Sequence, residues 1–362
     1  MSNQPGSSTA AQPDQPARDV PAGADEPAAD AARPASRTDG GTAPARAPGA
    51  VVLALLAVGW LAAMLWSTRA AITSAEAGVT AISLSAFALP GVISAALVAG
   101  AAVALAATNL LGRLGAGRDT LRFVVAVGAG LLVGLVAALV INLTYYDNAT
   151  TNVIAGTTAA TAVIGGALAG ALSIIGGSVP GAGTARVVGA IVTAALGALV
   201  FVVAFSKARD PLFDLFGAGD TQQSLFSAAK WVSRTESLLA GLLAGLLAFG
   251  YLTWARRRAE RHDPAAPGVR WPGYLLAGAG PGLLLLLAEI IIRVGGRSLL
   301  DLAGALSEAD AVAQTSLGTS RIDNGIWMLF VGALTALIAF GRTLGPAPHD
   351  DEDEATEATA DR

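Results

Sequence analysis

The sequence predicts an all-α fold: a polytopic membrane helix bundle of about eight transmembrane helices, with parallel internal hairpin repeats and a disordered cytoplasmic tail at each end. Two observations carry this prediction. The 362 residues are 53% hydrophobic and 14% charged, whereas a soluble domain carries about 25% charged residues. Apolar runs of roughly 20 residues, which is long enough to cross a bilayer, recur along the chain.

The two ends of the chain differ from its middle in composition and charge. Residues 1–49 are rich in Pro, Ala, Gly, Ser and Asp and contain too little bulky apolar surface to offset the entropy of ordering. Residues 343–362 contain the acidic run 350–354. Residues 1–49 and 342–362 together carry a net charge of −7, and the middle carries +3. We therefore expect two disordered tails around a membrane domain at 50–342.

Eight helical spans are predicted within this domain. The first follows a long tail without a compact basic segment before it, so it is expected to be a retained anchor and not a cleaved signal peptide. Small residues three or four apart, such as Gly130 with Gly134, let helices approach closely in lipid and indicate a compact bundle that also allows a homo-oligomer. The spans are about residues 51–66, 88–111, 121–142, 153–177, 185–206, 236–255, 273–293 and 324–341.

Basic residues in the loops predict the orientation of the bundle. With a cytoplasmic N-terminus, the inner loops hold nine arginines within about 36 residues, whereas the outer loops hold eight basic residues within about 89. Positive charge concentrates on the cytoplasmic side, so both termini are expected to be cytoplasmic. Arg outnumbers Lys by 21 to 2, which with abundant Ala, Gly and Pro indicates a GC-rich bacterial genome. The expected location is the bacterial cytoplasmic membrane.

An internal repeat is predicted at an offset of 87 residues. Ten of the 39 positions from 212 to 250 are identical to those 87 residues later, including Asp214 with Asp301 and Ser233 with Ser320. The repeated unit is an outgoing helix, an outer segment and a returning helix, at about 185–255 and 273–341. Both units have the same orientation, which predicts parallel repeats about an axis along the membrane normal.

The repeated outer-loop residues include two Ser-x-x-acid motifs, Ser233 to Glu236 and Ser320 to Asp323, each before an apolar run. This spacing is typical of a capping box, in which the side chains bond the free N–H groups at a helix start. The structural role is the favoured interpretation. The alternative is an ion-selecting ring of Arg234, Glu236, Arg321 and Asp323 around an outer vestibule.

The seventh span contains the candidate ion or substrate site. Glu289 and Arg293 are spaced i,i+4 and are expected to face each other. An ionisable group inside a membrane span is a functional candidate by default, although an arginine at the helix end neutralises it as a structural pair. Pro281, within Gly278–Gly282, predicts a break in this helix that either lines a site or is a simple kink.

Four arginines follow the sixth span: Arg256, Arg257, Arg258 and Arg261. They are expected to set the topology and to contact anionic lipid headgroups. The C-terminal acidic run has the opposite charge on the same side of the membrane. It is interpreted as a solvated tail, with docking onto these arginines or onto a basic partner as the alternative.

Composition and motifs limit the function. The chain has no cysteine, and its two histidines lie in polar segments, so no metal site or cofactor is expected. Nucleotide and nucleophile motifs are also missing from the sequence, so we expect neither an enzyme nor a nucleic-acid partner. Two hypotheses remain. The first is a non-catalytic protein that organises membrane or cytoplasmic partners through its tails, for example in cell-envelope assembly or division. The alternative is a permease or channel for a small solute or ion.

Overall fold

Long apolar runs become long helices in the computed structural model, which describes residues 47–74, 78–114, 119–145, 149–177, 184–217, 219, 221–264 and 268–344. These residues belong to one unit, Pro44–Arg362. They contain ten helices and no strand. The helices are α1 (Ala50–Ser74), α2 (Val79–Arg113), α3 (Asp119–Thr144), α4 (Ala149–Gly177), α5 (Thr184–Ser206), α6 (Arg209–Leu215), α7 (Gln222–Glu260), α8 (Trp271–Gly295), α9 (Arg297–Leu306) and α10 (Glu308–Gly341).

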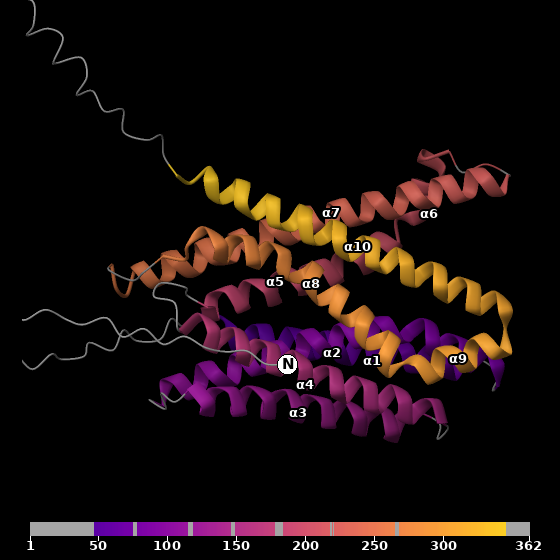
Figure 1. Ribbon diagram of the computed structural model, residues 1–362, viewed down its shortest axis with the longest axis horizontal. Helices are drawn as coiled ribbons and strands as arrows, with labels where there is room; N and C mark the ends of the chain where they lie inside the picture. The colour runs from indigo at the N-terminus through magenta and orange to yellow at the C-terminus, as the bar shows by residue number, and fades with distance from the viewer. Residues whose placement is uncertain are drawn as a thin grey trace, which may run out of the picture. The chain divides into compact units, whose positions relative to one another are not determined.

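The predicted all-α membrane bundle is confirmed. Eight of the helices in the described part of the chain are long and apolar enough to cross a membrane, and the two short ones, α6 and α9, follow α5 and α8. The long helices run along a common direction, with α3 and α4 on one side, α2 in the middle and α7 crossing α10 on the other (Figure 1). Of the predicted tails, 1–49 and 343–362, only residues 47–49 and 343–344 lie within the described ranges.

Several helices are longer than their apolar runs. At 1.5 Å per residue, α7 is about 58 Å long and α10 about 51 Å, against a hydrocarbon core of roughly 30 Å. Their polar first turns extend the helix beyond the apolar run, and each is capped. Thr221 Oγ1 accepts a hydrogen bond from Ser224 N, and Ser307 Oγ accepts one from Asp310 N, both at 3.2 Å.

The capping-box prediction at Ser233 and Ser320 is therefore wrong. Both residues lie inside helices, more than two turns beyond the starts of α7 and α10. Inside a helix the backbone N–H groups already bond to carbonyls four residues earlier, so a capping residue has no free donor to accept from. The repeated Ser-x-x-acid motifs are therefore helical segments of α7 and α10 and not outer-loop elements.

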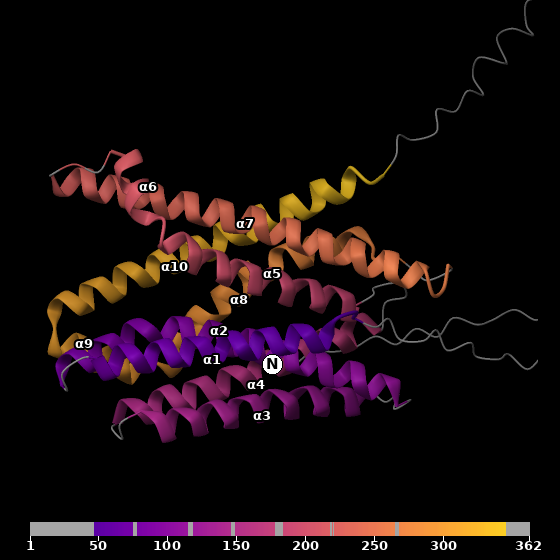
Figure 2. The ribbon, with the colours of Figure 1, turned by 180° about the vertical axis from the view of Figure 1, so that it is seen from behind.

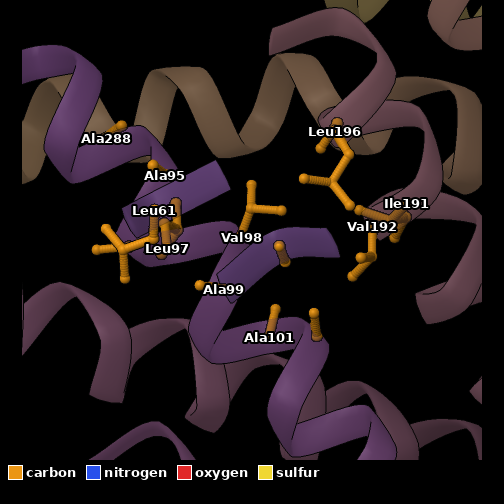
Figure 3. Packing of buried hydrophobic residues seen from close by; sticks show 14 of the residues in the cluster. Leu61, Ala95, Leu97, Val98, Ala99, Ala101, Ile191, Val192, Leu196 and Ala288 are labelled. Carbon is orange, nitrogen blue, oxygen red and sulfur yellow. The ribbon is translucent and has the colours of Figure 1, made fainter. Parts of the chain in front are cut away.

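Helix α2 is the central helix of the bundle. Most of its residues from Ala95 to Ala106 are buried, and it packs against α1, α3, α4, α5 and α8. Figure 3 shows Leu97, Val98 and Ala99 of α2 among side chains from the neighbouring helices, including Ile191 and Leu196 of α5. Lipid-facing helices carry the opposite pattern: α3 exposes Leu132, Leu135 and Leu139, among others.

Glycines bring α3 and α4 into backbone contact. A Cβ atom at Gly130 would lie 2.5 Å from the Ala162 carbonyl oxygen, and one at Gly134 would lie 2.6 Å from that of Ala159. Figure 2 shows α3 and α4 side by side along their length. This is the small-residue packing that the sequence predicts, and it holds helices together where lipid removes the hydrophobic driving force.

A tyrosine beyond the end of α3 ties it to α1. Tyr145 Oη donates a hydrogen bond of 2.9 Å to the Leu65 carbonyl oxygen. Burial raises the pKa of Tyr145 to about 12. The phenol therefore stays protonated, and remains a donor, throughout the physiological pH range.

We expect Gly134→Ala to lower the free energy of unfolding by about 1–3 kcal/mol, because the added methyl group overpacks the α3–α4 contact. The matched control is Gly128→Ala on the same helix, where the methyl group meets no atom within 4 Å. There the loss of backbone entropy in the unfolded state predicts stabilisation by roughly 0.5–1 kcal/mol. Unfolding of the purified protein in detergent measures both, and equal effects would contradict the packing account.

Candidate functional site

The candidate site is a cavity of about 240 Å³ between α1, α2, α5, α7, α8 and α10. It is larger than the cavity of about 150 Å³ that holds benzene in an engineered protein. Its walls are mainly apolar, and Figure 3 shows Leu97, Val98 and Ala288, which belong to them. The polar residues in the walls are Ser94, Glu236, Ser237, Glu289, Arg321 and Asn324.

Two prolines inside helices lie in the cavity wall, Pro90 of α2 and Pro281 of α8. Each removes the N–H that would bond to the carbonyl four residues earlier. Helix α8 continues through Pro281, from Trp271 to Gly295, so the predicted break does not end the helix, and Pro281 lines the cavity. Close packing against α10 supports helix α8 next to this proline: a Cβ atom at Gly282 would lie 2.6 Å from Leu329 Cα. The role of Pro90 was missed because the apolar run places it near a helix start.

Glu289 is the most buried charged residue of the site, with 5% of its side chain exposed. Its Oε1 pairs with Arg293 Nε at 3.1 Å, which confirms the predicted i,i+4 pair. Its Oε2 pairs with Arg321 Nε of α10 at 2.8 Å. The second partner lies 32 residues away along the chain, so only the packing of α8 against α10 brings it to the carboxylate.

Gly318 of α10 makes room for this charged group. A Cβ atom at this position would lie 3.2 Å from Glu289 Oε1 and 3.5 Å from Arg293 Nη2. The backbone of α10 therefore forms one wall of the ion-pair site. A larger residue would push the carboxylate or the guanidinium away from its present position.

Glu236 of α7 is the second buried carboxylate in the wall. Its side chain is 6% exposed, and Oε2 pairs with Arg209 Nη2 of α6 at 2.9 Å. Arg209 is half-exposed, so the short helix α6 supplies a counter-ion from the protein surface. The repeated motif points to Glu236 but not to Arg209, because no local spacing links the two residues.

Polar side chains join α7 to α10 beside the cavity. Ser233 Oγ lies 3.3 Å from Ser320 Oγ, and Ser237 Oγ donates to Asn324 Oδ1 at 2.6 Å. Both pairs are separated by 87 residues. Ser233 and Ser320, which were predicted as caps, therefore act in a contact between the two helices.

The remaining predicted residues lie away from the cavity. Asp214, Asp301 and Asp323 are exposed, and Asp301 pairs with Arg297 at 3.5 Å. The four arginines after the apolar part of α7 are exposed as well. Among them Arg256 Nε pairs with Glu260 at 2.6 Å. The acidic run at 350–354 lies outside the described residues.

The four residues that the sequence places in a ring around an outer vestibule do not form that ring. Of its four members, Glu236 and Arg321 line the cavity. Arg234 instead is exposed and lies over the Trp231 ring, 5.5 Å from its centroid. Because α7 and α10 pack through their Ser233 and Ser320 faces, neighbouring positions on each helix point in different directions.

The site therefore combines an apolar chamber with a charged end. Two buried carboxylates are each held by arginine, and one of the arginines, Arg321, lines the chamber itself. In the part of the chain that the structure describes, no three His, Asp or Glu side chains gather as a metal site would require. Mainly apolar chambers with a few convergent polar groups are typical of small-molecule sites.

No protein-family model, curated protein or solved structure matches this chain.

We expect the three arginines beside acids on α8, α9 and α10 to differ in their contribution to stability. Arg321→Met should lower the free energy of unfolding by about 1–3 kcal/mol, because it removes a charged hydrogen bond from buried Glu289. Arg293→Met should lower the free energy of unfolding by less than Arg321→Met does, since 55% of the Arg293 side chain is exposed. Arg297→Met is the control, because its pair is exposed and such pairs contribute about 0–1 kcal/mol. Thermal unfolding of the purified variants gives the order, and an Arg297 effect as large as that of Arg321 would contradict it.

Proposed function

We propose that this chain is a non-enzymatic permease for a small solute and that the cavity is its substrate site. The observation that carries the proposal is the meeting of Glu236, Glu289 and Arg321 in the wall of one mainly apolar cavity. Ligand sites in proteins are mainly apolar chambers with a few convergent polar groups. Ionisable groups within membrane helices are costly, and those that persist mark substrate or ion pathways.

The prolines of the cavity support a transport role. Pro90 and Pro281 weaken two of the helices that enclose the chamber, each at the level of the wall. Transporters use irregular helices at the level of their substrate sites. Local bending of α2 and α8 at these prolines would open and close the chamber, and at Pro281 it would shift the close contact between Gly282 and α10.

We also propose that the two helical units are parallel repeats. The contacts between α7 and α10 support this, since Ser233 meets Ser320 and Ser237 meets Asn324, each 87 residues apart. Equivalent residues of two copies touch each other only near the axis that relates the copies. The units also differ: α9 buries Leu299 and Ala303, whereas α6 buries no residue.

The proposed location is the bacterial cytoplasmic membrane, with both termini in the cytoplasm. The arginine density of the predicted inner loops supports this orientation. Lipid is the first partner of the bundle, and the exposed arginines after Trp254 fit anionic headgroups. The competing hypothesis, a protein that organises partners through its tails, depends on segments that lie almost wholly outside the described residues.

Uptake into proteoliposomes tests the proposal. The probes are three classes of labelled solute: amino acids, short monocarboxylates and alkyl phosphates. We expect at least one class to enter faster than into protein-free liposomes. Gly91→Leu should reduce this uptake at least tenfold, because Gly91 lines the cavity and a leucine side chain would fill part of it.

The matched control is Gly59→Leu on α1. Gly59 is exposed, and a Cβ atom there meets nothing within 4 Å. This variant adds the same side chain to a membrane helix outside the cavity wall and should transport like the unmodified protein. Uptake at the liposome leak rate for all three classes, or an equal loss in both variants, would overturn the proposal.

A further inference from the structure

We infer that the cavity binds a single-chain amphiphile with an oxyanion headgroup, a carboxylate or a phosphate, whose alkyl chain occupies the apolar chamber. This inference takes the cavity as the site from the proposed function, but it concerns what binds there and not whether the ligand crosses the membrane. It rests on the donor groups of the wall, the charge balance of the ion pairs and the shape of the chamber.

Arg321 is the group that faces the ligand. A guanidinium carries five N–H donors in a planar fork. Arg321 contacts Glu289 through Nε, so its Nη groups remain for a second acceptor. Both carboxylate oxygens of Glu289 already accept from arginine, one from Arg293 and one from Arg321. Beside Glu289, the groups still able to bond a ligand are therefore the Nη donors of Arg321, which suit an oxyanion.

The charge balance also favours an anion. The ion pairs beside the cavity form two separate groups, Arg209 with Glu236 and Glu289 with Arg293 and Arg321, and only the second group carries an excess positive charge. Arg209 and Arg293 are half-exposed. Arg321 is the least exposed of the three arginines, at 28%, and one anion beside it would neutralise the excess positive charge of its group.

The rest of the chamber fits an alkyl chain. Along α8 the wall extends from Glu289 back to Pro281, which is about 12 Å at 1.5 Å per residue. Trp60 and Met64 of α1 and Leu97 of α2 line the same chamber. A fully hydrophilic ion would lose its hydration against these side chains without replacement, whereas an alkyl chain gains from burial there.

Quenching of Trp60 fluorescence by brominated ligands tests the inference. The full chain is placed in phosphatidylcholine nanodiscs and titrated with terminally brominated decanoate, decyl phosphate and decanol. The difference in quenching between the unmodified protein and Trp60→Phe reports ligand in the cavity, since the chain has 6 tryptophans. We expect at least one of the two anions to bind at least tenfold more tightly than the alcohol.

The variants assign this selectivity to Arg321. Arg321→Gln should weaken anion binding at least tenfold and leave the alcohol unchanged. Arg234→Gln is the matched control, because Arg234 is the residue 87 positions earlier, is exposed and lies outside the cavity wall. If Arg321→Gln does not fold, the double variant Glu289→Gln/Arg321→Gln removes both charges of the buried pair and should show the same loss of selectivity.

Each result bears on the inference. Selectivity for the carboxylate alone, the phosphate alone or both supports it and identifies the headgroup. It is overturned by equal binding of alcohol and anions, by anion binding that survives loss of Arg321, or by quenching that Trp60→Phe does not alter. Selective binding with no uptake in proteoliposomes would overturn the transport proposal and leave the ligand class standing. Uptake without anion selectivity would overturn the ligand class and leave the transport proposal standing.

Discussion

The close approach of helix backbones through glycine and alanine is the constraint on which the rest of this structure depends. In lipid, apolar side chains gain little by leaving the membrane for the protein interior, so association depends on packing and on hydrogen bonds between helices. Gly130 and Gly134 place α3 against the carbonyls of α4. At the centre of the bundle, Gly100 of the alanine-rich helix α2 also lies against the backbone of α4. Among the helices that line the cavity, Gly278 and Gly282 bring α8 equally close to the backbone of α10.

Buried charge is tolerated here because it is paired across helices. An isolated carboxylate at the depth of Glu289 would be costly, but it has one guanidinium from its own helix and one from α10. Glu236 receives its counter-ion from α6. These pairs do not have to add stability, since replacing a buried pair by apolar residues is often neutral.

The contact between α7 and α10 joins the architecture to the site. Ser233, Ser237, Ser320 and Asn324 form a polar seam between parallel helices, in a register of 87 residues. That seam fixes the rotation of both helices about their axes. It thereby places Glu236 and Arg321 in the cavity wall, while Arg234 and Asp323 are left exposed. The seam thus decides which of the repeated charges line the cavity.

The sequence by itself determined the class of this protein, the eight apolar helices and the local Glu289–Arg293 pair. These features depend on composition and on spacings of three or four residues, which local geometry sets. Only the tertiary structure decided that Arg321 joins Glu289, that Arg209 joins Glu236 and that Pro90 and Pro281 line one chamber. It also showed that the residues capping α7 and α10 are Thr221 and Ser307, not Ser233 and Ser320. Which faces of different helices meet depends on packing between residues far apart in the chain, and no local pattern encodes that choice.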